Sequence, residues 1–279
     1  MFNHQYYYFV TALPNISFDS PKLPFSVEEF RAILDDTLHP TDKVLVDSYF
    51  LKYDNENLVA FLKNNNAALN NKGTLTLEQL KDIAVNDLYP SDKKTPRYFT
   101  DFVGLWQKED GEQNKNRLWE ELMTSFYMEY GIQSKSTLIA RWFEFNLNIG
   151  NILSAIYSRK YNMPIAEAIV GNNDVAEAIR KNASARDFGL GTNLDYFERI
   201  VNITKDPDIY ERERRIDKLR WNWLEANTAF DLFSIENIFA YLCKLQILER
   251  WVSLNAEEGE RVFRKLVAEL KSEVEVPAE

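Results

Sequence analysis

Apolar residues recur at helical spacing along most of this chain, and that periodicity is the strongest constraint on its fold. In residues 53–63, YDNENLVAFLK, Leu58 and Leu62 stand at positions i and i+4 and lie on one face of a helix. Asp54 or Asn55 is the predicted N-cap, because a short side-chain oxygen accepts hydrogen bonds from first-turn amides. The segment therefore predicts a capped, amphipathic helix.

Capping boxes mark further helix starts, since a Ser or Thr and a Glu or Gln three residues later can bond each other's backbone amides. Ser26 with Glu29 and Thr76 with Gln79 match this pattern. Strand signals are few: residues 6–14, YYYFVTALP, are the one β-like stretch and could equally form a buried helix that their final proline ends. Only 9 Gly and 9 Pro are present, which favours long helices over tight turns. The sequence predicts an all-α fold.

Composition limits the partners and the cellular compartment that suit this chain. With 279 residues, 45% of them hydrophobic, it can bury a sizeable core, and global disorder is excluded. A net charge of −10 disfavours nucleic-acid binding, because an acidic surface repels phosphates. The lone Cys243 fits a reducing compartment, and no run approaches the ~18 apolar residues that would span a bilayer. The N-terminus also lacks the basic start of a secretory signal, so we expect a soluble, cytoplasmic protein without membrane insertion.

Motifs for catalysis, cofactors and metals are missing from the sequence. Its two histidines, His4 and His39, lie in unrelated contexts, and no zinc, nucleotide-binding or nucleophile-elbow motif occurs. We therefore predict no catalytic, cofactor-binding or metal-ligating residue, and a role other than that of an enzyme. One alternative stays open, an α-helical enzyme whose site is assembled from scattered residues such as Arg141, Glu144 and Tyr157.

The segment around Asn57 has two relatives downstream. They are LNIGNILSAIYSRK (147–160) and FSIENIFAYLCK (233–244), in which Asn151 and Asn237 take the place of Asn57. Each asparagine follows a polar residue by three positions, precedes apolar residues at +1 and +5, and has a basic residue six to eight positions on. The polar residues are Asp54, Asn148 and Ser234, which we interpret as helix caps, and the basic residues are Lys63, Arg159 and Lys244.

The asparagines are 94 and 86 residues apart, too far for a tight solenoid but suitable for three helical sub-bundles in series. The sequence thus predicts three approximate modules, residues 1–100, 101–190 and 191–279. Chance is the alternative, because asparagine followed by an aliphatic residue is common at helix starts.

Three such modules resemble the C subunit, also called subunit d, of archaeal-type and V-type rotary ATPases. The best local match is residues 144–164, where Asn151, Arg159 and Lys160 fall on the asparagine and basic positions of that family's Asp-x-x-Asn-Leu-x-x-Leu-Leu-Arg-x-Lys signature. Residues 6–19 are also similar to the start of an uncharacterised bacterial family whose genes lie beside those of V-type ATPase subunits.

This resemblance implies a funnel of three modules with pseudo-threefold symmetry that seats on the membrane rotor ring and receives the central stalk. The chain would then be a non-enzymatic coupling subunit in ion or proton transport, peripheral to the inner membrane through its partners, the central-stalk subunits and the rotor ring. An all-α scaffold of an unrelated complex is the alternative. The repeat-signature or partner-binding residues would be Asn57, Lys63, Asn151, Arg159, Lys160, Asn237 and Lys244.

Overall fold

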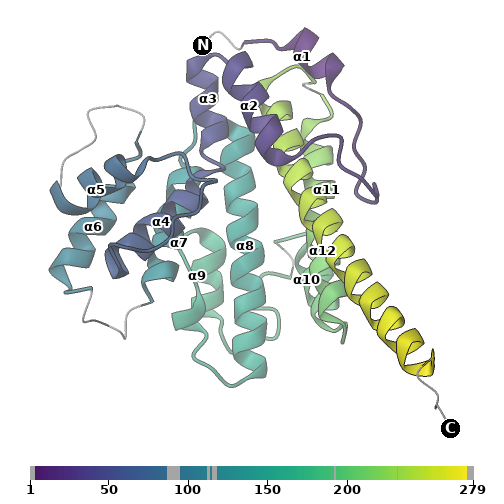
Figure 1. Ribbon diagram of the computed structural model, residues 1–279. Coiled ribbons are helices and arrows are strands. Elements are labelled where there is room, and N and C mark those ends of the chain that lie inside the picture. The colour runs from purple at the N-terminus through teal and green to yellow at the C-terminus, as the bar shows by residue number, and fades with distance from the viewer. Residues whose placement is uncertain are drawn as a thin grey trace. The chain divides into compact units, whose positions relative to one another are not determined.

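The computed structural model describes residues 4–86, 95–111, 114, 118–191, 193–230 and 232–274, with side chains as far as Asn255. These residues form α-helices and one short 3-10 helix and contain no strand, which confirms the all-α prediction (Figure 1). The elements are α1 (Tyr7–Ala12), α2 (Val27–Thr37), α3 (Pro40–Asp47), α4 (Leu51–Lys63), α5 (Leu77–Asn86), α6 (Tyr98–Lys108), α7 (Trp119–Ile132), α8 (Thr137–Lys160), η1 (Ala166–Ala168), α9 (Asp174–Lys181), α10 (Phe197–Thr204), α11 (Ile209–Thr228) and α12 (Ile235–Val274).

Both predicted capping boxes are present. The amide of Ser26 donates to Glu29 Oε2 at 2.7 Å, and the amide of Glu29 donates to Ser26 Oγ at 3.1 Å. Thr76 and Gln79 make the same reciprocal pair ahead of α5. The β-like stretch 6–14 forms the helix α1, although none of its residues is buried.

The predicted cap of the YDNENLVAFLK helix is wrong. Helix α4 begins at Leu51, so Asp54 and Asn55 lie inside it and both are buried. Neither side chain caps the helix. Asp54 instead accepts a hydrogen bond from the loop at Thr74, and Asn55 accepts one from the Tyr98 hydroxyl.

The chain divides into two compact units. Unit 1 comprises residues 1–37 and 221–279, and unit 2 comprises Leu38–Arg220. Helix α11 contributes its last part, from Trp221, to unit 1 and the rest to unit 2. The modules 1–100, 101–190 and 191–279 stay a prediction about repeated segments, and their boundaries differ from those of the units.

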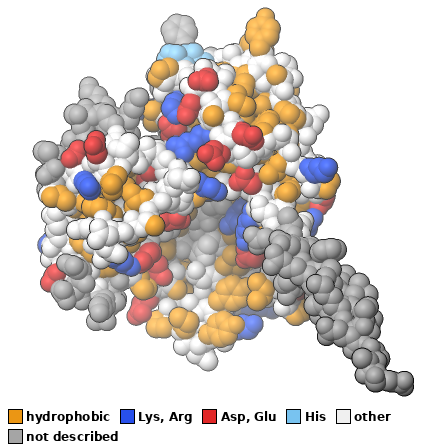
Figure 2. Space-filling view, in the orientation of Figure 1, with side chains coloured by type: hydrophobic (Ala, Val, Ile, Leu, Met, Phe, Trp, Pro, Cys, Tyr) orange, Lys and Arg blue, Asp and Glu red, His pale blue; other side chains and the backbone are white. Residues whose placement is uncertain are grey.

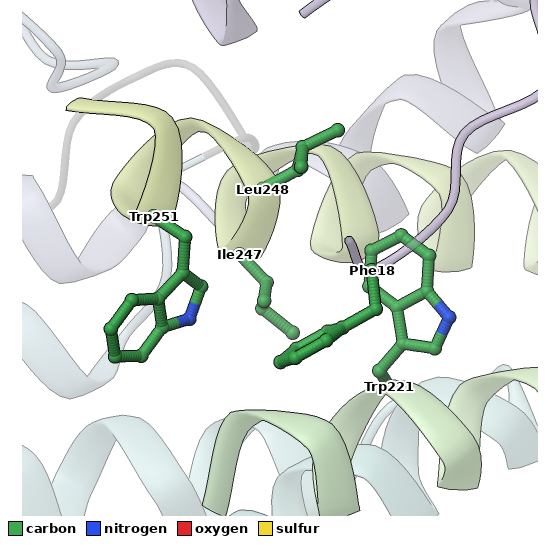
Figure 3. Close-up of a cluster of buried hydrophobic side chains, with 5 residues drawn as sticks. All are labelled: Phe18, Trp221, Ile247, Leu248 and Trp251. Atoms are coloured by element: carbon green, nitrogen blue, oxygen red, sulfur yellow. The ribbon is translucent and has the colours of Figure 1, made fainter. Parts of the chain in front are cut away.

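Unit 1 joins the two ends of the described chain. Helix α2 packs on α12, and the amide of Val27 donates to Glu249 Oε1 at 2.8 Å. Five buried side chains form its hydrophobic cluster, in which the rings of Phe18 and Trp221 meet edge to face at 5.7 Å (Figure 3). The cluster consists of Phe18, Trp221, Ile247, Leu248 and Trp251.

Unit 2 is built on α4, α7 and α8. Helix α7 packs against both α4 and α8, while α9 and α10 cover α8 and α5 lies against α4. Gly131 permits the close approach of α7 to α8, because a Cβ at that position would lie 2.1 Å from the Phe143 ring. Within the described part of the chain, no helix combines the length and apolarity needed to span a membrane.

Candidate functional site

Asn57 holds the loop that follows α4. Its side chain is 3% exposed and forms two hydrogen bonds with the backbone of one residue. Nδ2 donates to the Asn70 carbonyl at 2.9 Å, and Oδ1 accepts from the Asn70 amide at 2.6 Å. A side-chain amide thus pairs with a main-chain amide as a neighbouring strand would, and satisfies both of its groups.

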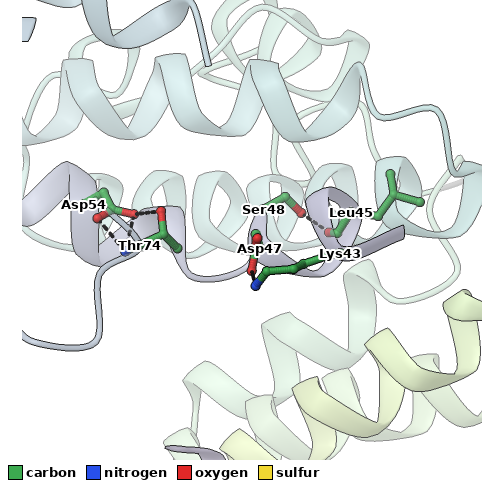
Figure 4. A network of polar contacts seen from close by, with 6 residues as sticks. All are labelled: Lys43, Leu45, Asp47, Ser48, Asp54 and Thr74. Carbon is green, nitrogen blue, oxygen red and sulfur yellow. Dashed lines mark hydrogen bonds and ion pairs between the residues drawn. The ribbon is translucent and has the colours of Figure 1, made fainter. Parts of the chain in front are cut away.

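Asp54, one helical turn earlier, holds the next part of the same loop (Figure 4). Its carboxylate accepts hydrogen bonds from the amide and hydroxyl of Thr74, at 2.8 Å each, and from the amide of Leu75 at 2.9 Å. Gly73 lies against this carboxylate, because a Cβ there would stand 2.5 Å from Asp54 Oδ1. Together Asp54 and Asn57 fix the path from α4 to α5.

Asn151 repeats this arrangement in α8. Its side chain is 2% exposed; Nδ2 donates to the Val170 carbonyl at 2.8 Å, and Oδ1 accepts from the Val170 amide at 2.9 Å. Asn148, one turn earlier, accepts from Nδ2 of Asn173 at 2.8 Å. Asn173 in turn caps α9, with its Oδ1 accepting from the Ala176 amide at 3.0 Å.

The two asparagines therefore make the same pair of hydrogen bonds. In each segment, a buried asparagine inside a helix binds the backbone of the following loop, and a polar residue one turn earlier fixes the approach to the next helix. We call Asp54 with Asn57 the first clamp, and Asn148 with Asn151 the second clamp. Both clamps lie in unit 2, and the repetition of whole modules stays a prediction.

Asn237 does not form a third clamp. It is half-buried in the first turn of α12, and its Nδ2 donates backward to the Leu232 carbonyl. Its amide donates to Ser234 Oγ at 3.4 Å, so Ser234 does act as the cap that the sequence predicted. The corresponding cap predictions for Asp54 and Asn148 are wrong, because both residues lie inside their helices.

The predicted basic residues bind their own chain. Lys63 forms an ion pair with Glu120 at the start of α7, and that hydrogen bond lowers the pKa of Glu120. Lys160 is exposed, with its ammonium 5.6 Å from the centroid of the Tyr161 ring. In unit 1, the Lys244 ammonium lies 5.4 Å from the centroid of the Trp221 ring, and burial lowers the pKa of Lys244.

Arg159 closes the loop after α9. Its guanidinium donates to the carbonyls of Ala183, Ala185 and Arg186 at 2.6 to 2.9 Å. It also stacks on the Phe188 ring, 3.8 Å from the centroid. This geometry gives Arg159 a role in folding unit 2.

The residues of the enzyme alternative do not converge. Arg141 and Tyr157 are sixteen residues apart in α8, which places them roughly 24 Å apart along its axis. Arg141 and Glu144 are both exposed, and the Tyr157 hydroxyl accepts from Arg212 at 3.2 Å. Among the described residues, no group of three or more His, Cys, Asp or Glu side chains is placed to hold a metal ion.

A family model described as "Protein of unknown function (DUF2764)" matches residues 3–274, so the chain belongs to that family. No curated protein and no solved structure gives a match to it. The family description names no activity.

Proposed function

We propose that this DUF2764 member is a non-enzymatic coupling or adaptor subunit of a V/A-type rotary ATPase, linking the central stalk to the membrane rotor ring. The observation that carries the proposal is the repetition of the clamp, at Asn57 in α4 and again at Asn151 in α8. Serial helical modules with an asparagine at this place are what the resemblance to the C subunit implies. The third clamp of that pattern is replaced by a helix cap at Asn237.

The hydrogen bonds of the clamp residues and of Arg159 favour a structural role, as in an adaptor subunit. Both clamps and Arg159 satisfy backbone groups of their own chain, so these residues maintain the shape of unit 2. Side chains that a partner could cover lie elsewhere, because large hydrophobic residues are exposed on both units. In unit 1 they include Tyr7, Tyr8, Phe230 and Leu232; in unit 2 they include Tyr161, Met163 and Ile209.

The net negative charge of the chain suits a partner with a basic surface. Figure 2 shows acidic and basic side chains interspersed with hydrophobic ones on the visible face. With a net charge of −10, the chain would attract a basic stalk subunit over long range, and mixed surface charges would set the orientation of docking. Such a subunit would be cytoplasmic and held at the inner membrane by its partners.

Reconstitution tests this function. The purified chain is mixed with purified central-stalk subunits, and separately with the detergent-solubilised rotor ring, and complexes are resolved by size-exclusion chromatography. We expect a complex with each partner, and weaker stalk binding at high salt because screening removes the long-range attraction. A Tyr161→Ser/Met163→Ser double variant, compared with Val85→Ser, tests whether the exposed apolar residues that follow α8 take part in binding.

Binding to neither the stalk nor the ring would contradict the proposal. A complex with a different set of proteins under the same conditions would instead favour the scaffold alternative. The repeated clamps are compatible with that role as well, since they specify modules and not a partner.

A further inference from the structure

A cleft runs between α4 and α7 in unit 2. It has a volume of about 630 Å³, within the range of small-molecule sites. Its α4 wall spans Lys52 to Lys63, which corresponds to roughly 16 Å of helix. The lining residues are Lys52, Asn55, Glu56, Val59, Ala60 and Lys63 from α4, and Glu120, Met123, Thr124, Tyr127 and Met128 from α7.

The middle of the cleft is apolar. Val59, Met123 and Tyr127 are buried there, and Met128 adds a second flexible thioether to the α7 wall. Methionine side chains adapt to differently shaped apolar groups, as in surfaces that bind several ligands. Two lysines and two glutamates balance one another around this centre, so the cleft has no strong preference for a net charge.

Asn55 places one directional group inside the cleft. The residue is only 7% exposed, and its Oδ1 accepts the hydroxyl of Tyr98 at 2.7 Å. Among the residues that the structure describes, Nδ2 has no hydrogen-bond acceptor. No buried side-chain nitrogen or oxygen of the described residues lacks a hydrogen-bond partner, so Nδ2 is open to the cleft. A ligand oxygen placed there would accept a hydrogen bond from it.

In the helix that carries the second clamp, two side chains are instead hydrogen-bonded to α11. Arg220 Nε of α11 donates to Asn146 Oδ1 of α8 at 2.9 Å, and Arg212 donates to Tyr157 at 3.2 Å. Between α4 and α7, the ion pair of Lys63 with Glu120 lies at one end of the cleft, and the cleft extends along α4 as far as Lys52. The cleft thus lies beside the helix that carries the first clamp.

We propose that the α4–α7 cleft binds a small amphipathic molecule. Its apolar body lies between Val59 and Met123, and its carboxylate or carbonyl oxygen accepts a hydrogen bond from Asn55 Nδ2. This site goes beyond the proposed role in a rotary ATPase and does not depend on it.

Methyl NMR gives a site-specific test. The chain has 4 methionines, of which Met123 and Met128 line the cleft, whereas Met163 is exposed elsewhere in unit 2. Protein labelled with ¹³C at the methionine methyls is titrated with decanoate, decanamide and decyltrimethylammonium, each below its micelle concentration. We expect decanoate and decanamide to shift the Met123 and Met128 signals saturably and to leave Met163 unchanged. The trimethylammonium head offers no acceptor, so that probe should bind at least tenfold more weakly.

Three variants separate the apolar and polar parts of the site. Ala60→Phe fills the cleft and should abolish the shifts, whereas Ala32→Phe, at an exposed position of α2, should preserve them. Asn55→Leu should reduce the affinity for decanoate and decanamide about tenfold. Tyr98→Phe removes the neighbouring hydroxyl but keeps Nδ2, and therefore controls for loss of the Tyr98 contact.

Equal shifts at Met163, equal binding of all three probes, or unchanged binding by Ala60→Phe would overturn the proposal. Absence of any probe-induced shift would overturn it too. If purified stalk subunits alone moved the Met123 and Met128 signals, the cleft would be a protein-docking surface, and the adaptor function would stand without the ligand site. If the probes bound and the stalk subunits did not, the opposite conclusion would follow.

Discussion

Replacing Asn151 by alanine tests the claim that the chain contains two clamps and not three. The substitution removes both hydrogen bonds between the side chain and Val170, and leaves a main-chain amide and a carbonyl without partners. A buried polar group that loses its partner costs about 1–3 kcal/mol. Val170 is half-buried, so water compensates in part, and we expect the free energy of unfolding to fall by about 2–4 kcal/mol.

Alanine variants of Asn57 and Asn237 distinguish a clamp from a helix cap by how much each lowers the free energy of unfolding. Asn57→Ala removes the equivalent pair of bonds to Asn70 and should have a similar effect. Asn237 is half-buried and bonds an exposed residue, Leu232, so Asn237→Ala should cost less than about 1 kcal/mol. Urea unfolding followed by circular dichroism gives the three free energies. Hydrogen exchange locates the loss, because the amide of Val170 should exchange faster only when Asn151 is changed.

An Asn237→Ala variant as destabilised as Asn151→Ala would refute the distinction between clamp and cap. Losses below about 0.5 kcal/mol at both Asn57 and Asn151 would refute the clamps themselves, since that is the range of ordinary surface substitutions.

Further predictions concern the first clamp and the tyrosines. Gly73→Ala should destabilise unit 2 by about 1–3 kcal/mol in urea unfolding, because its Cβ would overlap Asp54. Gly104→Ala in α6, where a Cβ meets nothing within 4 Å, should stabilise it by up to about 1 kcal/mol. Asp54→Asn turns an amide donor toward the donors of Thr74 and should cost about 1–3 kcal/mol, seen as faster exchange of the Thr74 amide. Burial raises the pKa of Tyr241 from 10.0 to about 12, so the folded state keeps this proton longer than the unfolded state; stability should fall from pH 10 to pH 12, and less steeply in Tyr241→Phe.

The helices were predictable because their signals are local. Periodic apolar residues such as Leu58 and two reciprocal capping boxes, at Ser26 and Thr76, need no information from distant parts of the chain. The hydrophobic cluster of unit 1 was not predictable in this way, because Phe18 meets Trp221 across some two hundred residues of sequence. Nothing in either local segment specifies the other.

The clamps were only partly predictable. The asparagines were found by comparing segments, but their partners, the main chains of Asn70 and Val170, carry no sequence signature. The resemblance at Asn237 misled for a physical reason. Apolar residues at +1 and +5 occur in any amphipathic helix, whether the asparagine lies inside it or in its first turn, as Asn237 does. The cleft donor Asn55 was read as a cap because its short polar side chain precedes the apolar residues from Leu58 on, whereas α4 begins earlier, at Leu51.

Clamp and cleft use different faces of one helix. Asn57 and Asn55 are two residues apart in α4, which separates their side chains by about 200° around its axis. Asn57 therefore fixes the loop toward α5 on one side while Asn55 faces α7 on the other. Because the clamp holds the loop from the opposite face of α4, residues of the cleft can vary without loosening that loop. We expect Ala60→Phe to leave the exchange rate of the Asn70 amide unchanged, and faster exchange there would show that the two faces are coupled.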